Sequence, residues 1–207
     1  KVSMLRMSNA METATTLALA GRETLLGAAN LGLRLLRYGN ERSLLVLGIT
    51  CEHDSDDLQS GTENAAELII RAHGGLSTGT LIGKMWKKSR FHTPYLRNTL
   101  WEKGYALDTL ETALPWSKVL ECNAAAKAAI RSALEDCGER VLVFSHLSHV
   151  YTDGASMYIT FLWRRAADPQ ETLRRWQMMK AAASQVILAH GGTISHQHGV
   201  GVDHRAY

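Results

Sequence analysis

The segment from Ile194 to His204 has the highest density of residues able to do chemistry, with three histidines and two glycines in ISHQHGVGVDH. His196 and His198 are two positions apart, so in an extended backbone both imidazoles would project from one face. Gly199 and Gly201 would let the backbone turn sharply or pass close to a ligand. An imidazole exchanges protons near neutral pH, so the segment is typical of a proton-transfer site, although a strand entering a glycine turn with exposed histidines has the same spacing.

Tyr158 is the second candidate, because it stands in an alternating segment from Ala155 to Arg165. Alternation with a period of two predicts a strand whose successive side chains point to opposite faces. Met157 and Phe161 fall on the apolar face and Tyr158 falls on the more polar one. Tyr158 is therefore a possible proton-transfer partner of the histidines, and an ordinary sheet tyrosine with a solvated hydroxyl is the alternative.

The sequence predicts neither a metal site nor a nucleotide-binding loop. Six of the nine histidines fall in the last third of the chain, but the sequence has no paired cysteines and no HExxH helix motif of the kind that zinc sites favour. The pairs Gly74-Gly75 and Gly191-Gly192 each follow a predicted helix, and neither GxGxxG nor GxxxxGK[ST] occurs. These glycines are predicted to be helix caps.

The elements that position these residues follow from the hydrophobic pattern. The first half of the chain predicts a helix at Leu17–Tyr38, a strand buried on both faces at Ser43–Thr50, a helix at Asp57–His73 and a crossing connection at Thr78–Lys103. The second half predicts strands at Tyr105–Ala113, Arg140–Tyr151, Ala155–Arg165 and Thr193–His196, with helices at Ser117–Cys137 and Pro169–His190. The order β-α-β-β-α-β predicts an α+β fold with a ferredoxin-like antiparallel sheet covered by helices, extended by the N-terminal helix-strand-helix.

Length and composition predict one domain over residues 1–207, because 207 residues with 45% hydrophobic and 21% charged residues can bury a sizeable core. The net charge of +3 is dispersed, which argues against nucleic-acid binding. Three cysteines without paired spacing indicate a reducing compartment, so a cytoplasmic location is expected. The chain starts at Lys1 and ends directly after the glycine-rich motif, so we expect it to be a piece of a longer protein.

Several segments together resemble the C-terminal half of FAD-linked oxidases of the vanillyl-alcohol oxidase superfamily, in particular the alkyl-dihydroxyacetonephosphate synthase branch. The resemblance covers nearly the whole chain in the family's order. The segments are Met4–Ser8, Thr93–Arg97, Asp108–Ala113 with Pro115-Trp116, Ser148–Tyr151, Gly154–Tyr158 and Ile194–His204.

The resemblance implies that the chain is a cap, or substrate-binding, domain that closes over the isoalloxazine of FAD, which a separate N-terminal domain would hold. Tyr158 matches the family's active-site tyrosine proposed to handle a substrate proton. His196 and His198 match the outer members of a histidine triplet at the flavin, so they are both catalytic and cofactor-binding candidates. Gln197 takes the middle place, and its amide forms hydrogen bonds but cannot shuttle protons.

Arg97 and Arg6 match family arginines near the active site. A guanidinium offers a forked, permanent positive charge to a phosphate, so both are substrate-binding candidates. A surface or structural ion pair is the alternative for each. For Glu111 and Trp116, packing or hydrogen bonding is expected.

Two activities of the parent enzyme fit the resemblance. One exchanges the acyl group of an acylated dihydroxyacetone phosphate for a fatty alcohol through a flavin adduct, and the other is FAD-dependent oxidation of a 2-hydroxy acid or similar alcohol. A non-catalytic ligand-binding module is a third alternative, and the isolated domain is expected to be inactive and free of flavin. The expected partners are a small-molecule substrate, acylated or phosphorylated, and the FAD domain. A homodimer and a peripheral membrane association of the parent enzyme are left open.

Overall fold

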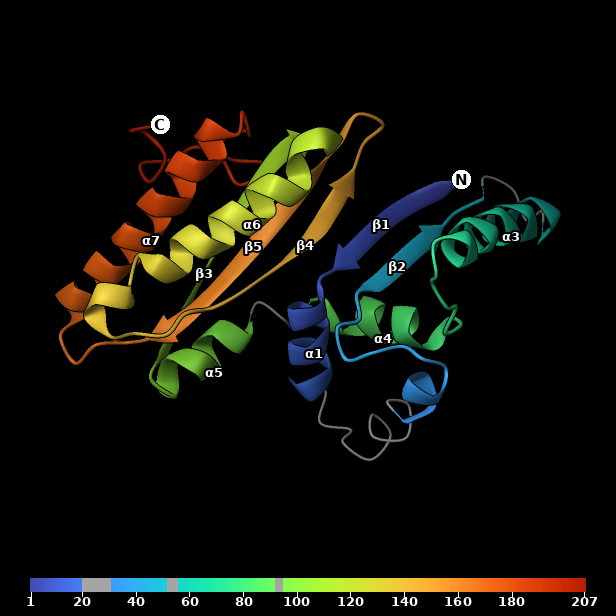
Figure 1. Cartoon of the computed structure of the whole chain (residues 1–207), viewed down its shortest axis with the longest axis horizontal. Coiled ribbons are helices and arrows are strands. Elements are labelled where there is room, and N and C mark those ends of the chain that lie inside the picture. The colour runs from blue at the N-terminus through green and yellow to red at the C-terminus, as the bar shows by residue number, and fades with distance from the viewer. Residues whose placement is uncertain (20–30, 52–55, 92–94) are drawn as a thin grey trace.

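The computed structural model describes residues 1–19, 31–51, 56–91 and 95–207, and it shows an α+β domain built on one five-stranded antiparallel sheet (Figure 1). The strands lie in the order β2-β1-β4-β5-β3. They are β1 (Val2–Ser8), β2 (Leu44–Ile49), β3 (Tyr105–Pro115), β4 (Leu142–Val150) and β5 (Gly154–Arg164). The helices are α1 (Ala10–Leu19), α3 (Asp56–Ala72), α4 (Leu81–Ser89), α5 (Leu96–Glu102), α6 (Trp116–Ser132), the 3-10 helix η2 (Glu135–Cys137) and α7 (Pro169–Ala189).

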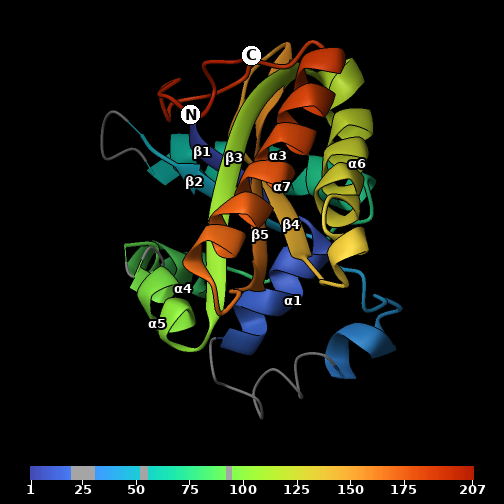
Figure 2. The same ribbon diagram turned by 90° about the vertical axis from the view of Figure 1, so that its left-hand side faces the viewer.

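The hydrophobic core lies between one face of β3, β4 and β5 and the two long helices α6 and α7, which run side by side over that face (Figure 2). Met157, Ile159 and Phe161 of β5 are fully buried there, as the alternation predicted. Ile130 of α6 and Ile187 of α7 are buried against them. Because side chains alternate along β5, Tyr158 lies on the face away from these helices.

The start of α7 is also confirmed. Asp168 accepts a hydrogen bond from the backbone N–H of Gln170 at 2.9 Å, and Pro169 occupies the first turn, where no backbone N–H is needed. Gly191 follows the helix with φ of +74°, a left-handed conformation that glycine adopts without steric cost.

The predicted strand at Thr193–His196 is wrong, because these residues form no strand in the structure. Of these four residues, Thr193 alone hydrogen-bonds to the backbone of β3. Its N–H donates to the carbonyl oxygen of Ala113 at 3.1 Å, and its hydroxyl accepts from the N–H of Ala113 at 2.9 Å. The chain then turns away through Gln197, Gly199 and Gly201, all with positive φ, so the pairing cannot continue.

Beside β4 lies β1, a strand that the sequence pattern did not predict. The pattern missed β1 because most of its side chains are exposed or half-buried, which gives no clear alternation. Strand β2 was predicted, but its expected burial on both faces is wrong. It pairs only with β1, and among its residues only Val46 is buried, because it is an edge strand.

The helix Asp57–His73 is confirmed as α3, and the crossing connection holds the short helices α4 and α5. The predicted helix Leu17–Tyr38 falls partly outside the described residues, within which α1 ends at Leu19 and residues 31–35 are helical. None of the helices in the described ranges combines the length and apolar character needed to cross a bilayer.

Candidate active site

The polar face of β3, β4 and β5 carries a cluster centred on the carboxylate of Glu111, whose side chain is only 3% exposed. The Oε1 atom accepts hydrogen bonds from the hydroxyls of Ser148 and Ser156, the latter at 2.9 Å. Three imidazoles also face this carboxylate. The distances are 3.5 Å from His149 Nδ1 to Oε1, 3.4 Å from His196 Nδ1 to Oε1 and 3.2 Å from His198 Nε2 to Oε2.

Glu111 stays ionised in this environment. Burial by itself would raise the pKa of its carboxyl, but the hydrogen bonds from Ser148 and Ser156 and the charges of His196 and His198 together outweigh it, so the pKa lies below its usual value. The cluster therefore contains one fixed negative charge surrounded by hydroxyls and imidazoles.

A β-bulge in β4 brings two of these residues to the same side. The register of β4 against β5 shifts between Leu147 and His149, so that two residues of β4 lie opposite Ser156. Such an extra residue re-aims side chains that strict alternation would send to opposite faces. Ser148 Oγ lies 2.6 Å from Ser156 Oγ, and His149 Nδ1 lies 3.2 Å from the same atom.

His196 and His198 do converge, but not through the extended backbone that the spacing predicted. Gln197 between them has φ of +60°, a left-handed conformation that is uncommon for residues other than glycine. The turn at this residue directs both rings to Glu111. His196 is also fixed from its other side, because Tyr151 Oη lies 2.9 Å from His196 Nε2. Trp116 supports this tyrosine segment, since its indole N–H donates to the carbonyl oxygen of Tyr151 at 3.3 Å.

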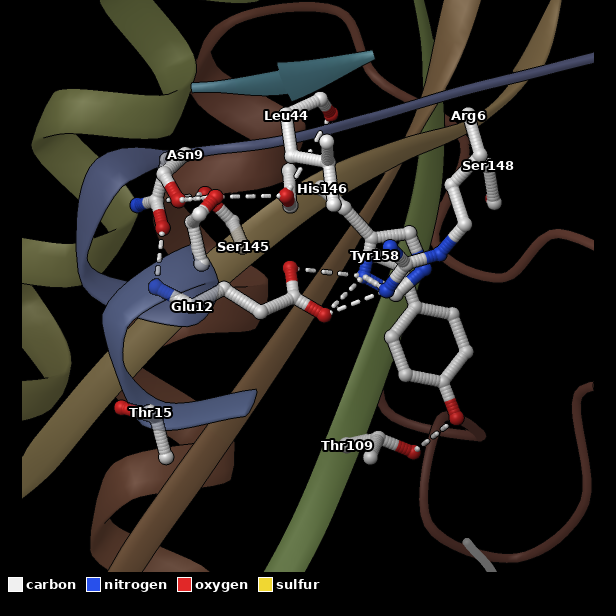
Figure 3. A network of polar contacts seen from close by, with 12 residues as sticks. Arg6, Asn9, Glu12, Thr15, Leu44, Thr109, Ser145, His146, Ser148 and Tyr158 are labelled. Atoms are coloured by element: carbon white, nitrogen blue, oxygen red, sulfur yellow. Dashed lines mark hydrogen bonds and ion pairs between the residues drawn. The ribbon is translucent and has the colours of Figure 1, made fainter. Parts of the chain in front are cut away.

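Tyr158 lies directly beside the cluster, because it pairs with Glu111 across β3 and β5. Its ring stacks on His146, with ring centres 4.9 Å apart and 15° between the planes. The ring of His198 meets it edge-on at 5.4 Å. The hydroxyl donates to Thr109 Oγ1 at 3.2 Å (Figure 3).

Burial raises the pKa of the Tyr158 phenol, and the nearby carboxylates of Glu111, Asp108 and Glu12 raise it further, while the bond to Thr109 acts in the opposite direction. The phenol is therefore protonated at neutral pH. It is a proton donor held between two imidazoles.

A second polar network lies behind Tyr158 and includes Arg6 (Figure 3). One terminal nitrogen of Arg6 lies 2.5 Å from Glu12 Oε1 and 3.2 Å from His146 Nδ1. The same His146 nitrogen lies 3.1 Å from Glu12 Oε2. The structure thus places Arg6 in an ion pair that holds the stacking partner of Tyr158.

Arg97 is exposed on α5, which leads into the first residue of β3. Glu111 is six residues further along this strand, about 20 Å at the rise of an extended chain. Within the described residues the structure does not bring Arg97 to the histidine cluster. The motif that includes it, Thr93–Arg97, begins outside the described residues.

A pocket of about 200 Å³ opens beside His198, at the free edge of β3. Lys180 of α7 is buried there, 3.6 Å from Asp108 and donating to the carbonyl oxygen of Thr109 at 3.2 Å. His204 lines the same pocket and is also buried, and burial is the main cause that lowers its pKa. The loop after α7 therefore covers the strand edge with polar residues.

The residues predicted for the site did not include His149, Ser156, His146 and Glu12. For Glu111 only packing or hydrogen bonding was expected, and the structure shows it accepting hydrogen bonds at the centre of the cluster. The missing signal is long-range: these residues come from β3, β4, β5 and α1, and only strand register brings them together. The family segments were the available signal for five of the cluster residues, namely Glu111, Ser148, His149, Tyr151 and Ser156.

The family model of FAD linked oxidases, C-terminal domain, matches residues 1–207. The chain belongs to this family. It resembles alkyldihydroxyacetonephosphate synthases: it is 27% identical over 136 residues to the enzyme of Trypanosoma brucei brucei and 29% identical over 160 residues to that of Caenorhabditis elegans. These matches cover 66% and 75% of this chain.

The chain spans only about a quarter of the length of these curated relatives, 22% and 26% respectively. A solved structure of an alkyldihydroxyacetonephosphate synthase superposes with a TM-score of 0.73 at 20% identity, covering 99% of this chain and 37% of the other. At this identity the superposition establishes the fold. It shows that this domain of the FAD-linked oxidase family keeps the fold of an alkyldihydroxyacetonephosphate synthase while most side chains differ.

Proposed function

We propose that this chain is the substrate-binding and catalytic cap domain of an FAD-dependent enzyme that exchanges the acyl group of an acylated dihydroxyacetone phosphate for a fatty alcohol. The observation that carries the proposal is the protonated phenol of Tyr158, set beside His198 on a sheet face that α6 and α7 do not cover. The alkyldihydroxyacetonephosphate synthase relatives supply the reaction class.

The residues present fit a flavin docked against this face. The His198 side chain is 38% exposed beside Tyr158, so its ring is accessible to a ligand on this face. When bound, FAD supplies the ring system at which the substrate carbon is activated. A second domain would hold most of the cofactor, because no phosphate-binding glycine motif occurs in this chain.

In this function Tyr158 gives and takes the substrate proton, and His198, in contact with its ring, accepts or returns it. A positioned acid-base group contributes about 10²- to 10⁴-fold to a rate. Glu111 acts as a positioning residue that fixes the orientation of His196 and His198. His146 fixes the plane of the Tyr158 ring and is itself held by Glu12 and Arg6.

For the phosphate, we propose Arg6, which lies in the network beside Tyr158. Arg97, which the structure does not bring to the histidine cluster, stays a prediction from the family resemblance. Arg97 is exposed and carries a permanent charge. Arg6 already neutralises Glu12, so a substrate phosphate would have to share its guanidinium with that carboxylate.

The test is the Tyr158→Phe variant of the flavin-containing protein, assayed for acyl-to-alkyl exchange with an acyl-dihydroxyacetone phosphate and a fatty alcohol. We expect a loss of kcat of about 10²-fold or more with flavin content unchanged. Tyr105→Phe, at the exposed start of β3, is the matched control and should keep full activity.

Unchanged exchange in Tyr158→Phe would contradict the role of the phenol. Bleaching of the flavin by a 2-hydroxy acid, with reoxidation by an acceptor and no exchange activity in the unsubstituted protein, would replace the proposal by the oxidase or dehydrogenase alternative.

A further inference from the structure

We propose that Glu111, His149 and His196 form a binding site for one divalent transition-metal ion of the zinc class, with a fourth coordination position left open. This goes beyond the proposed function, because it needs neither FAD nor substrate. It also differs from the expectation drawn from the sequence, in which the absence of paired cysteines and of an HExxH motif predicted no metal site.

The geometry of the three residues matches the edges of a small coordination tetrahedron. Bonds of 2.0 to 2.2 Å to a tetrahedral ion place neighbouring ligand atoms about 3.3 to 3.6 Å apart. Glu111 Oε1 lies 3.5 Å from His149 Nδ1 and 3.4 Å from His196 Nδ1, and all three ligand atoms lie within 4.8 Å of one another. One ion can therefore reach all three with small side-chain movements.

The donor set selects the class of ion. Two imidazoles and one carboxylate suit zinc and its neighbours, whereas calcium and magnesium prefer oxygen ligands only. Three protein ligands with a free fourth position are typical of sites that bind water or substrate on the ion.

The Nδ1 atom of His196 is a second and independent observation. It is buried, faces Glu111 Oε1 and has no hydrogen-bond partner among the described residues. A buried polar atom left unbonded costs about 1 to 3 kcal/mol. A metal ion between the two atoms would satisfy the nitrogen and the carboxylate together.

The surroundings resemble the outer shell of a metal site. Ligating imidazoles usually hold a hydrogen bond on the other ring nitrogen, and ligating carboxylates are themselves hydrogen-bonded. Tyr151 Oη lies 2.9 Å from the other nitrogen of His196, and the two serine hydroxyls bond to Glu111. All three ion pairs of Glu111 within the described ranges are with imidazoles, so no lysine or arginine there competes with an ion for this carboxylate.

With an ion in the site, the imidazoles would serve two functions, metal binding and proton transfer. His149 and His196 would hold the ion, while His198, whose ring packs against Tyr158, would stay available for proton transfer. The ion would then lie beside the proton-transfer pair without replacing it.

The experiment is a titration of the untagged chain, freed of metal with a chelator, with Co²⁺ followed by visible absorption and with Zn²⁺ followed by calorimetry. We expect one ion per chain and the intense visible bands of cobalt in a four-coordinate site. Removing an outer-shell partner of a metal costs about 10- to 100-fold in affinity, so Tyr151→Phe should weaken binding about 10-fold and His149→Ala, which removes a ligand, about 100-fold or more.

A loss of metal binding is informative only if the variant still folds. The His149 side chain is 42% exposed, so His149→Ala should fold, and circular dichroism would check this. Glu111→Gln removes the carboxylate ligand as a second variant. His73→Ala is the control. This exposed histidine directly follows α3, its Nδ1 lies 2.9 Å from the carbonyl oxygen of Ile69, and its removal should leave metal binding unchanged.

Cys51 and Cys137 are free and only half-buried, so their serine variants test whether thiols capture the ion. Binding that persists in these variants and falls in His149→Ala supports the site. Three results would overturn it: no stoichiometric binding, binding unaffected in His149→Ala, or binding lost in the cysteine variants. None of them bears on the exchange assay, so failure of this site and failure of the proposed function are distinguishable.

Discussion

The two faces of strand β5 are made from alternate residues of the same segment, yet they have opposite properties. Met157, Ile159 and Phe161 are fully buried under α6 and α7. On the other face, Tyr158 contacts imidazoles and hydroxyls and stays partly accessible. Along one strand, a step of a single residue therefore separates side chains that stabilise the fold from side chains that can do chemistry. The buried face supplies the apolar burial, and the polar face holds groups whose protonation the fold can tune.

The largest expected effect tests the apolar face. Phe161→Ala should lower the free energy of unfolding by about 3 to 5 kcal/mol, because it leaves a cavity in a packed core. Tyr158→Ala, on the polar face of the same strand, should lower the free energy of unfolding by only about 2 kcal/mol, because neighbours pack against only part of this ring. Urea denaturation followed by circular dichroism measures both. Equal losses would contradict the division between the faces.

A smaller effect is expected for the centre of the polar face. Glu111→Gln should lower the free energy of unfolding by about 2 kcal/mol, because the hydroxyls of Ser148 and Ser156 lose a charged acceptor in a buried position. The control is Glu121→Gln on the exposed surface of α6, for which we expect no measurable change in the free energy of unfolding. If the two variants unfold at the same denaturant concentration, Glu111 does not organise the cluster.

The stability of the fold should depend on pH through the buried carboxyl of Glu12, which belongs to the polar side of the sheet. Burial would raise the pKa of its carboxyl, but the bond and charge of His146 and the charge and bond of Arg6 together lower it below the ordinary value of 4.5. A lowered pKa in the folded state means that ionised Glu12 stabilises the fold above pH 4.5. This contribution to the free energy of unfolding is lost as the pH falls through the pKa that Glu12 has in the folded protein.

Thermal unfolding between pH 3 and pH 7 should therefore show a steeper acid loss for the unsubstituted protein than for Glu12→Gln. The exposed Glu41→Gln should follow the unsubstituted curve. Parallel curves for the protein and Glu12→Gln would show that the ion pair with His146 and Arg6 contributes nothing to stability.

The smallest expected effect concerns the turn that delivers the histidines. Gln197 has a left-handed conformation, which costs about 1 to 2 kcal/mol for a residue with a side chain. Gln197→Gly removes this cost and gives the unfolded chain more freedom, so the net change should stay within about 1 kcal/mol. Gln197→Val should destabilise by about 1 to 2 kcal/mol, measured by the same denaturation. A stable valine variant would contradict the left-handed turn.

Local patterns predicted the elements in which one periodicity dominates. The alternation of β5 and the Asp168-Pro169 start of α7 were confirmed, because each signal lies within a few neighbouring residues. The strand predicted at Thr193–His196 failed because positive φ at Gln197 and the following glycines directs the chain away from β3. Strand β1 was missed because its side chains are not clearly divided between buried and exposed.

The candidate site was predictable only in part. Tyr158 and the two histidines were found from the motif and the family resemblance, and the structure places all three around Glu111. Glu111 lies in the family segment Asp108–Ala113, and hydrogen bonding was among the roles expected of it. Its place at the centre of the cluster could not be predicted, because it depends on partners from β4, β5 and the C-terminal loop. The bulge before His149 was likewise not predicted. It shifts the alternation by one position, and over the few residues that follow it in β4 such a shift cannot be distinguished from the end of the strand.

The β1–β2 ribbon is joined to the rest of the sheet at a narrow seam. Strand β1 meets β4 through only two residue pairs, Met7 with Leu147 and Ser8 with His146. The contact of Glu12 with His146 crosses the same seam. A tilt of the ribbon would therefore move His146, whose imidazole stacks on the Tyr158 ring. The first dozen residues of the chain are in this way coupled to a tyrosine far away in the sequence.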